Sequence, residues 1–363
     1  MRQPLIRKKV QTKSLSRNRD YNIKNLQLYL ETFRKKRIFL KVFFIKHHTH
    51  FGGCMRRVIL SNPRGFCAGV VRAIQVVESA LEKWGAPIYV KHEIVHNRHV
   101  VDDLKRRGAI FIEDLKDVPC GEKVIYSAHG IPPEVREEAK ARNLFDIDAT
   151  CVLVTKIHSA VKLYASKGYQ IILIGKKKHV EVIGIRGEAP ESVTVVEKVE
   201  DVANLPFDIH VPLFFVTQTT LSLDDVAEVT QALKARYPHI ITLPSSSVCY
   251  ATQNRQEALR AVLPRVNFVY VIGDVQSSNS NRLREVAEKR NIPARLVNSP
   301  DHISDEILHY SGDIAVTAGA STPEHIIQSC ISRLKELIPD LQVEEDIFTT
   351  EDVVFQPPKE LRT

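Results

Sequence analysis

The sequence predicts an α/β fold in which mostly parallel sheets are covered on both faces by helices. From residue 58 onward, short runs rich in β-branched residues alternate with longer segments that have the apolar spacing of amphipathic helices. The strand candidates are mostly apolar, which is typical of parallel strands buried on both faces. No low-complexity linker interrupts this region. These observations together indicate a body built from repeated strand–helix units.

The elements follow one another in a regular order along the chain. Short β-branched runs predict strands at 58–60, 88–90, 124–126, 171–174, 213–216, 268–272 and 314–317. Helical apolar spacing predicts helices at about 70–84, 134–142, 154–167, 224–236, 282–290 and 324–337. Because the helices lie between the strands in sequence, crossover connections and parallel pairing are expected.

Composition and charge place most of the chain among ordinary globular proteins. The 363 residues are 44% hydrophobic and 26% charged, which gives no sign of disorder or of a fibrous protein. The net charge of +8 is uneven, because residues 1–54 hold 14 lysines and arginines but only two acids. The remainder therefore carries a net charge of −4. The basic character belongs to the first segment and does not indicate a nucleic-acid-binding face on the body.

Residues 1–54 are interpreted as a basic extension that precedes the body. Their apolar stretch at 38–45 is too short to span a bilayer, and the segment lacks the features of a secretory signal. Two interpretations stay open. The segment is basic and acid-poor like an organelle transit peptide, or the start codon lies upstream of the true start at Met55. The expected location is cytoplasmic, with organelle import through residues 1–54 as the alternative.

Small polar residues follow four of the predicted strands. Gly, Ser, Thr, Asn or Gln residues come directly after the strands at 124–126, 213–216, 268–272 and 314–317. Ligands of α/β sheets bind at the carboxyl ends of the strands, and helix N-termini there favour phosphate. Capping alone explains any single case, such as the capping box that begins at Ser321. Four such turns together favour an anionic ligand.

Three of the six cysteines share one position in the predicted fold. Cys67, Cys151 and Cys249 each lie at a strand-to-helix corner, spaced 84 and 98 residues apart. One thiolate from each of three α/β units is thereby placed to converge on a centre, although each cysteine alone is also explained as a small buried hydrophobe. No Cys-x-x-Cys pair or close-spaced zinc set is present. The three cysteines without this shared placement are Cys54, Cys120 and Cys330.

The segment from His92 to Asn97 contains the pattern His-Glu-x-x-His, with the second histidine at His96. Zinc hydrolases carry this pattern in the middle of a helix, with a further ligand downstream. Here the histidines directly follow the predicted strand at 88–90. A zinc hydrolase is therefore kept only as an alternative.

Two other histidines are placed for proton chemistry. His129 follows the predicted strand at 124–126, and His179 and Glu181 point to the same side if the stretch 179–181 is extended. A His–Glu pair beside a metal centre is suited to proton delivery.

Eight segments in order resemble the family of 4-hydroxy-3-methylbut-2-enyl diphosphate reductases, also called IspH or LytB. The resemblance covers about residues 55–361, and motifs of this length in this order are highly specific. The segments are 62–69 (NPRGFCAG), 92–97 (HEIVHN), 127–130 (SAHG), 148–151 (DATC), 217–222 (TQTTLS), 249–252 (CYAT), 277–282 (SSNSNR) and 317–321 (TAGAS).

The resemblance implies three α/β units arranged with pseudo-threefold symmetry around a central iron–sulfur cluster. Cys67, Cys151 and Cys249 would hold three irons of a [4Fe–4S] cluster, and the fourth iron is left open for the substrate's hydroxyl oxygen. The implied reaction is the reductive dehydroxylation of (E)-4-hydroxy-3-methylbut-2-enyl diphosphate to isopentenyl and dimethylallyl diphosphates, the last step of the non-mevalonate isoprenoid pathway. A ferredoxin, a flavodoxin or a reductase system is the expected electron donor, with neither nucleic acid nor a membrane span involved.

The family's other roles fall on matching positions. Glu181 would deliver the proton that lets hydroxide leave as water, supported by Thr219 and His179. The implied substrate-binding residues are His96, His129, His179, Gln218, Thr219, Ser277, Ser278, Asn279 and Ser321. The departures are Lys176 in place of histidine, Val180 in place of proline and Val71 in place of aspartate, and none removes a proposed ligand or proton donor.

The expected organisation is a basic extension (1–54), a start of the body that packs with the third unit (55–68), three α/β units (69–151, 152–245 and 246–334) and a C-terminal segment that folds back on the body (335–363). A non-catalytic iron–sulfur sensor is a further alternative. It predicts a basic face or a nucleic-acid module in the body, and the sequence of the body contains neither.

Overall fold

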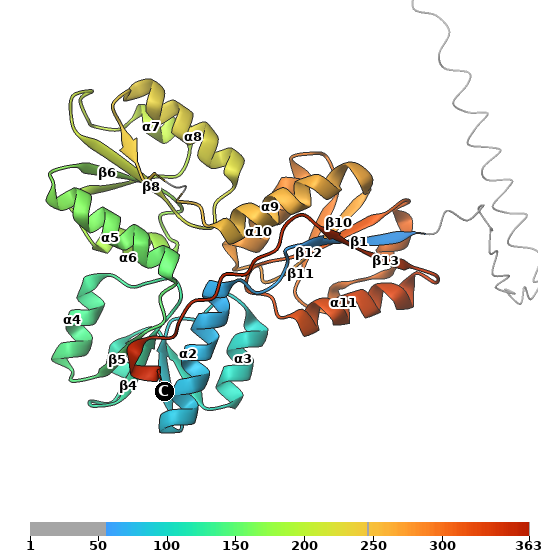
Figure 1. The fold of residues 1–363 in the computed structure, drawn as a ribbon, viewed down its shortest axis with the longest axis horizontal. Coiled ribbons are helices and arrows are strands. Elements are labelled where there is room, and N and C mark those ends of the chain that lie inside the picture. The colour runs from blue at the N-terminus through green and yellow to red at the C-terminus, as the bar shows by residue number, and fades with distance from the viewer. Residues whose placement is uncertain (1–55, 245–246, 363) are drawn as a thin grey trace, which may run out of the picture. The chain divides into compact units, whose positions relative to one another are not determined.

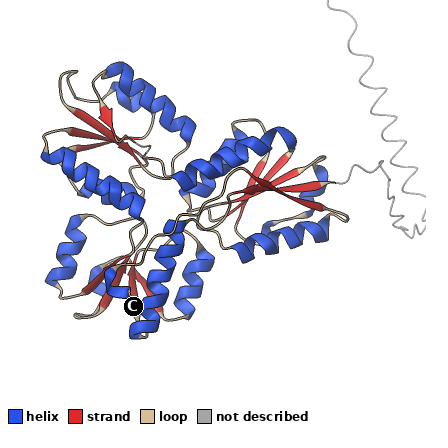
Figure 2. Ribbon diagram, in the orientation of Figure 1, coloured by secondary structure: helices blue, strands red, loops and turns tan. Residues whose placement is uncertain are grey.

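The structure is a computed structural model that describes residues 56–244 and 247–362. It contains three sheets with helices packed against them (Figures 1 and 2). Every strand pair is parallel. The prediction of an α/β fold is therefore confirmed and sharpened to three parallel sheets. The basic extension expected at 1–54 lies outside the described residues.

The first sheet has the strand order β3-β2-β4-β5. Its strands are β2 (Ile88–Lys91), β3 (Ala109–Ile112), β4 (Lys123–Tyr126) and β5 (Phe145–Asp148). The helices of this part of the chain are α2 (Ala68–Trp84), α3 (Arg98–Arg106) and α4 (Pro133–Ala141).

The second sheet has the order β7-β6-β8-β9. Its strands are β6 (Gln170–Ile174), β7 (Val193–Val196), β8 (Leu213–Thr217) and β9 (Ile241–Thr242). Its helices are α5 (Val152–Ser166), α6 (Val180–Gly187), α7 (Val199–Ala203) and α8 (Leu223–Arg236).

The third sheet has the order β11-β10-β12-β1-β13, so it joins the beginning of the described chain to its end. Its strands are β1 (Arg57–Asn62), β10 (Phe268–Ile272), β11 (Ala294–Val297), β12 (Ile314–Ala318) and β13 (Gln342–Ile347). Its helices are α9 (Tyr250–Val262), α10 (Ser278–Glu288) and α11 (Glu324–Leu337). After β13 the chain runs back to α2, where the Arg72 side chain donates to the Gln356 carbonyl oxygen over 2.8 Å.

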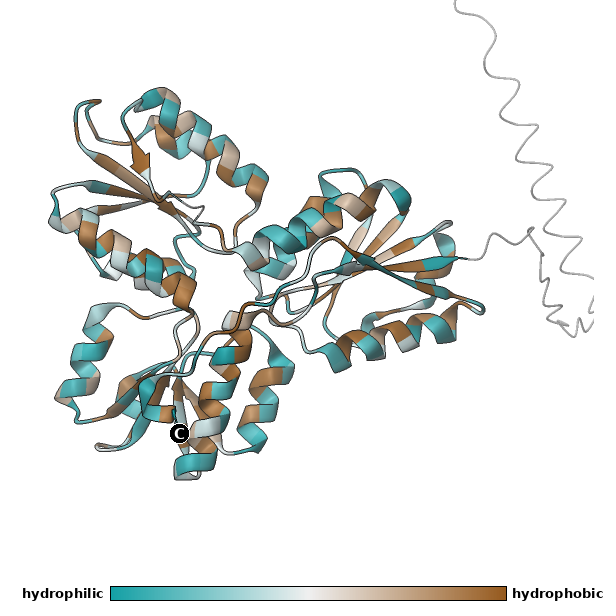
Figure 3. Cartoon of the chain, viewed as in Figure 1, coloured by the Kyte–Doolittle hydropathy of each residue, from teal (hydrophilic) through white to brown (hydrophobic). Residues whose placement is uncertain are grey.

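Burial explains why the strands read as apolar runs. Strands β8, β10 and β12 are buried at every position, and Figure 3 shows hydrophobic residues concentrated in the sheets and on the helix faces that cover them. Covering both faces removes the alternating pattern of a half-exposed strand. Among the described residues, no helix is long and apolar enough to cross a membrane.

One local expectation is wrong. The stretch from His179 to Glu181 is not extended, because helix α6 begins at Val180. Its sequence contains β-branched residues and two glycines, all of which disfavour a helix. The helix forms because Val182 and Ile185 bury completely against the second sheet, and tertiary packing outweighs the weak local preference.

Candidate functional site

Each of the three predicted cysteines is the N-cap residue of a helix. Cys67 precedes α2, Cys151 precedes α5 and Cys249 precedes α9. Their backbone N–H groups donate to carbonyl oxygens of three loops that follow strands: Cys67 to Ala320 (3.1 Å), Cys151 to Ala128 (3.0 Å) and Cys249 to Thr219 (3.1 Å). Every cysteine is thus fixed by the same kind of bond to a neighbouring strand end.

The three side chains line one cavity, whose wall comes from all three sheets and their helices. Gly69 shows how closely they approach, because a Cβ atom built on it would lie 2.6 Å from Sγ of Cys151 and 3.9 Å from Sγ of Cys67. A methyl group does not fit at the shorter distance. The lining residues include Cys67, His96, His129, Cys151, His179, Glu181, Thr219, Cys249, Ser277, Ser278, Asn279 and Ser321.

The thiols are free and electrostatically coupled. None of the three cysteines forms a disulfide. Burial, together with the neighbouring Cys67, raises the pKa of Cys151 to about 12 and that of Cys249 to about 11. Ionising all three neighbouring thiols therefore costs free energy unless a cation lies among them. A metal centre removes that cost, because metal binding replaces the thiol protons.

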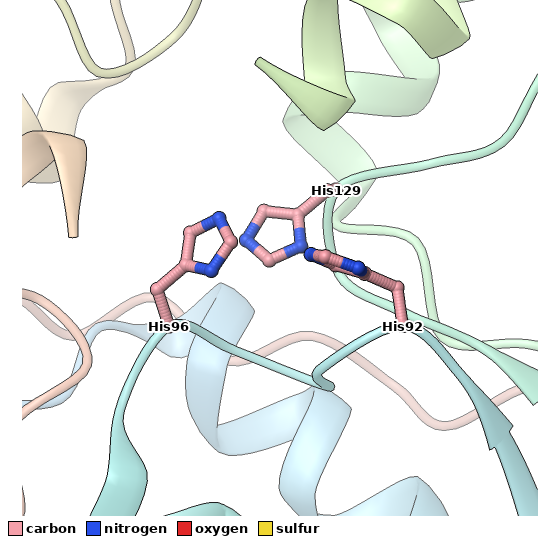
Figure 4. Close-up of side chains that lie close together, drawn as sticks. All are labelled: His92, His96 and His129. Carbon is pink, nitrogen blue, oxygen red and sulfur yellow. The ribbon is translucent and has the colours of Figure 1, made fainter. Parts of the chain in front are cut away.

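Four histidines form a cluster beside the cysteines, and Figure 4 shows three of them facing one another from the loops after β2 and β4. The rings of His96 and His129 stack with centroids 4.1 Å apart. His179 lies edge-on to both, at 5.7 Å from His96 and 6.1 Å from His129. His92 completes the cluster at 5.6 Å from His96 but is not part of the cavity wall.

The zinc-hydrolase alternative does not fit the backbone. His92 has a φ of 63°, and the helix after it, α3, begins only at Arg98. The two histidines of the His-Glu-x-x-His pattern therefore do not lie on a helix. His92, His96 and His129 do bring ligand atoms within 4.8 Å of one another, but the helical frame of that hydrolase motif is missing from these residues.

Glu181 is the most buried acid of the site, with 2% of its surface exposed. Its carboxylate accepts two hydrogen bonds from Thr219, one from the backbone N–H (2.6 Å) and one from the hydroxyl (2.9 Å). Burial raises the pKa of Glu181 to about 7, although the Thr219 bonds oppose this rise. Such a carboxyl holds a proton near neutral pH, as a general acid requires.

His179 caps helix α6 with its own ring. Its Nδ1 accepts a hydrogen bond from the Glu181 N–H over 3.2 Å, which places the hydrogen of the neutral ring on Nε2. Burial lowers the pKa of His179 to about 4, with His96 adding to the effect. Burial and the neighbouring imidazoles likewise hold the pKa of His129 well below its usual value. A nearby negative charge would favour the protonated form of these rings and so oppose the lowering of their pKa. The rings are therefore suited to bind an anion.

A polar arm faces the histidines from the third sheet. Ser277 caps α10, so the N–H groups of Ser278 and Asn279 lie in the first turn, where a helix favours anions. The amide of Asn279 is buried, and neither its oxygen nor its nitrogen has a partner within the described residues. Ser321 donates to the His96 carbonyl oxygen over 3.0 Å. An unpaired buried amide needs a ligand or water as partner.

Gln218 is the one predicted residue that is not in the cavity wall. Its buried side chain accepts from the Lys176 N–H (3.1 Å) and donates to the Thr220 hydroxyl (3.1 Å). The sequence reasoning did not single out Thr220 and Thr252, which both line the cavity. Thr220 lies in the motif at 217–222 and Thr252 in the motif at 249–252. The Thr252 hydroxyl contacts Sγ of Cys249 at 3.1 Å.

Comparison with known proteins gives the family. The family model "LytB protein" matches residues 58–335. A 4-hydroxy-3-methylbut-2-enyl diphosphate reductase of Chlamydia caviae is 94% identical over 308 residues, covering 85% of this chain and all of the relative. The reductase of the same description from Chlamydia pneumoniae is 74% identical over 308 residues, with 85% of this chain and 99% of the relative covered.

Solved structures agree with the sequence relatives. The E-1-hydroxy-2-methyl-but-2-enyl-4-diphosphate reductase from Plasmodium falciparum has a TM-score of 0.82 and 47% identity, covering 85% of this chain and 96% of that one. A second reductase, described as the terminal enzyme of the non-mevalonate pathway, has a TM-score of 0.57 and 31% identity, covering 78% of this chain and all of that one. The resemblance drawn from the motifs is confirmed: the chain belongs to the LytB family, the family of 4-hydroxy-3-methylbut-2-enyl diphosphate reductases.

Proposed function

We propose that this chain catalyses the reductive dehydroxylation of (E)-4-hydroxy-3-methylbut-2-enyl diphosphate to isopentenyl and dimethylallyl diphosphates. This activity is inferred from family membership, because relatives described as 4-hydroxy-3-methylbut-2-enyl diphosphate reductases match the chain over nearly their whole length. The observation that carries the chemistry is the convergence of Cys67, Cys151 and Cys249 on one cavity from three helix N-termini.

Cys67, Cys151 and Cys249 are the proposed ligands of a [4Fe–4S] cluster. The fit is supported by the donor set, since soft thiolates suit iron–sulfur clusters and the three free thiols adjoin one another. When bound, such a cluster supplies two electrons in single steps and one iron site open to the substrate's oxygen. The proposed architecture is pseudo-threefold about this centre, with units at 69–151, 152–245 and 246–334.

Glu181 is the proposed proton donor. Its raised pKa keeps a proton on the carboxyl near neutral pH, and its contacts with Thr219 fix the orientation of the carboxyl group. Hydroxide is a poor leaving group, so protonation at the leaving oxygen lowers the barrier to its departure as water. His179 supports the arrangement because its ring accepts from the Glu181 N–H.

The diphosphate is proposed to lie between the histidines and the polar arm of the third sheet. Neutral imidazoles donate from one ring nitrogen, and the first turn of α10 adds backbone donors. Binding the diphosphate at this end orients the reacting carbon. The proposed contacts are His96, His129, His179, Ser277, Ser278, Asn279 and Ser321, with Thr219 beside Glu181 and Gln218 supporting Thr220 from behind.

The electron donor is proposed to be a ferredoxin, a flavodoxin or a reductase system, and the location is proposed to be cytoplasmic. The decisive experiment combines anaerobic purification, iron and sulfide analysis, and turnover of the hydroxymethylbutenyl diphosphate with a chemical reductant. We expect about four irons and four sulfides per chain, broad absorption near ~400 nm and formation of both products. Colourless protein with roughly one zinc after attempted reconstitution contradicts the proposal.

A further inference from the structure

A second cavity, of about 200 Å³, lies next to the loop that carries His129. Two of its polar atoms, Nε2 of His158 and Oγ1 of Thr150, are buried and have no hydrogen-bond partner within the described part of the chain. Buried polar atoms need partners, and a polar cavity of this size is large enough for water. Its other polar lining residues are Arg136, Asp148, Thr155, Ser159, Lys162 and Glu188.

Glu188 determines how the ring of His158 is held. His158 is 8% exposed, and its Nδ1 lies 2.7 Å from Oε1 of Glu188 at the end of α6. The carboxylate keeps a hydrogen on Nδ1, so Nε2 of the neutral ring is an acceptor directed away from Glu188. This nitrogen is buried and has no partner within the described residues, although His158 itself lines the second cavity.

His158 packs between two segments of the active site. A Cβ atom built on Gly130 would lie 2.8 Å from its Nε2, and one built on Gly184 would lie 3.3 Å from its Cε1. Gly130 directly follows His129, whereas Gly184 lies on α6, one turn after Glu181. The imidazole therefore touches both the loop that presents His129 and the helix that presents Glu181.

We infer that His158, held by Glu188, is a positioning residue that fixes His129 and Glu181 relative to each other. This inference rests on the proposed role of Glu181 as proton donor. His158 also acts on that donor directly, because it lowers the pKa of Glu181. His158 thus lies outside the wall of the substrate cavity and influences two residues within it.

Several charged residues line the second cavity with His158. Glu188 is its ion-pair partner, and Lys162 lies one turn further along the same helix with its side chain exposed. Across the cavity, Arg136 and Asp148 pair with each other. The titratable and charged residues that line the second cavity with His158 are Arg136, Asp148, Lys162 and Glu188, and Glu181 interacts with His158 electrostatically.

The test replaces His158 with glutamine in the cluster-loaded full chain, with His99→Gln as the matched control. The Nε2–H of His99 donates to the Asn298 carbonyl oxygen over 2.6 Å, and His99 is not in the wall of either cavity. We expect H158Q to raise the Kd of inorganic diphosphate, measured by calorimetry, about tenfold, within the range that small misplacements cause. The alkaline limb of the kcat–pH profile should move to higher pH, because His158 lowers the pKa of Glu181 and glutamine does not.

A purely structural role predicts a lower melting temperature with an unchanged pH profile and diphosphate Kd in the folded fraction, and that result overturns the inference. If H158Q does not fold, Glu188 provides the test. Glu188→Gln keeps an acceptor for Nδ1 and should preserve diphosphate binding, whereas Glu188→Ala should weaken it about tenfold. Equal binding by the two variants refutes the inference. Turnover by Glu181→Gln contradicts the proposed function instead, so the two failures are distinguishable.

Discussion

The backbone N–H of Cys249 donates a 3.1 Å hydrogen bond to the carbonyl oxygen of Thr219. Thr219 in turn donates from its own N–H and hydroxyl to the carboxylate of Glu181. One residue therefore connects a proposed cluster ligand with the proposed proton donor through three hydrogen bonds. The relative position of Cys249 and the Glu181 carboxylate is therefore fixed by two backbone N–H groups and one hydroxyl.

Replacing Glu181 with glutamine should leave the cluster in place and lower kcat by about 10²- to 10⁴-fold, because the amide keeps the shape of the side chain but carries no acidic proton. Single-turnover product analysis with a chemical reductant measures this loss. Glu137→Gln, on the exposed face of α4, is the control. Turnover of E181Q at the wild-type rate contradicts the assignment.

Replacing cysteines one at a time should distinguish those that bind iron from those that do not. Cys151→Ser removes one of three thiolates and should sharply lower iron and sulfide content after reconstitution, because a serine oxygen is a harder and weaker donor for iron. Cys120→Ser is the matched control, since Cys120 is exposed and not part of the cavity. Equal iron content in both variants argues against ligation by Cys151.

The kcat–pH profile should have an alkaline limb near pH 7. Burial raises the pKa of Glu181 from 4.5 to about 7, so the protonated form that donates is present below this pH and is lost as the pH rises through it. Reduced methyl viologen is a suitable electron source because its potential does not depend on pH. The same limb in the E181Q variant would assign it to a different group.

Replacing Asn279 with alanine should raise the KM for the diphosphate by about 10- to 100-fold with a smaller effect on kcat, since a hydrogen bond to a charged group contributes ~1.5–3 kcal/mol. Asn279→Asp should weaken binding more, because it places a negative charge beside the diphosphate. Asn204→Ala, which removes only an exposed bond to the Glu200 carbonyl oxygen, is the control. An unchanged KM in N279A shows that its unpaired amide does not meet the substrate.

Replacing Gly69 with alanine should reduce cluster occupancy while the chain still folds. The added methyl group would lie 2.6 Å from Sγ of Cys151, so this sulfur must move. Iron content reports the displacement, and circular dichroism melting controls for general destabilisation. Full iron content together with a wild-type melting temperature contradicts the close approach of α2 to Cys151.

The residues that line the cavity could be predicted from the sequence wherever they belong to long family motifs. The strands at 124–126 and 268–272 and the helix at 324–337 were also predictable, because a strand buried on both faces is a continuous apolar run and a helix buried on one face has helical apolar spacing. Helix α6 was not, because its β-branched and glycine-rich sequence favours other conformations. The ring of His179 as the cap of that helix was missed for the same reason.

The sequence by itself determined the α/β class, the family and the list of residues available for chemistry, since these depend on local periodicity and on motifs read along the chain. Only the tertiary structure decided that the N–H groups of Cys67, Cys151 and Cys249 bond to loops far away in sequence. It also decided that Gln218 lies behind the cavity wall and that His158 touches both Gly130 and Gly184. Such contacts join segments that are separated along the chain, and no local preference of a residue encodes which distant segment it meets.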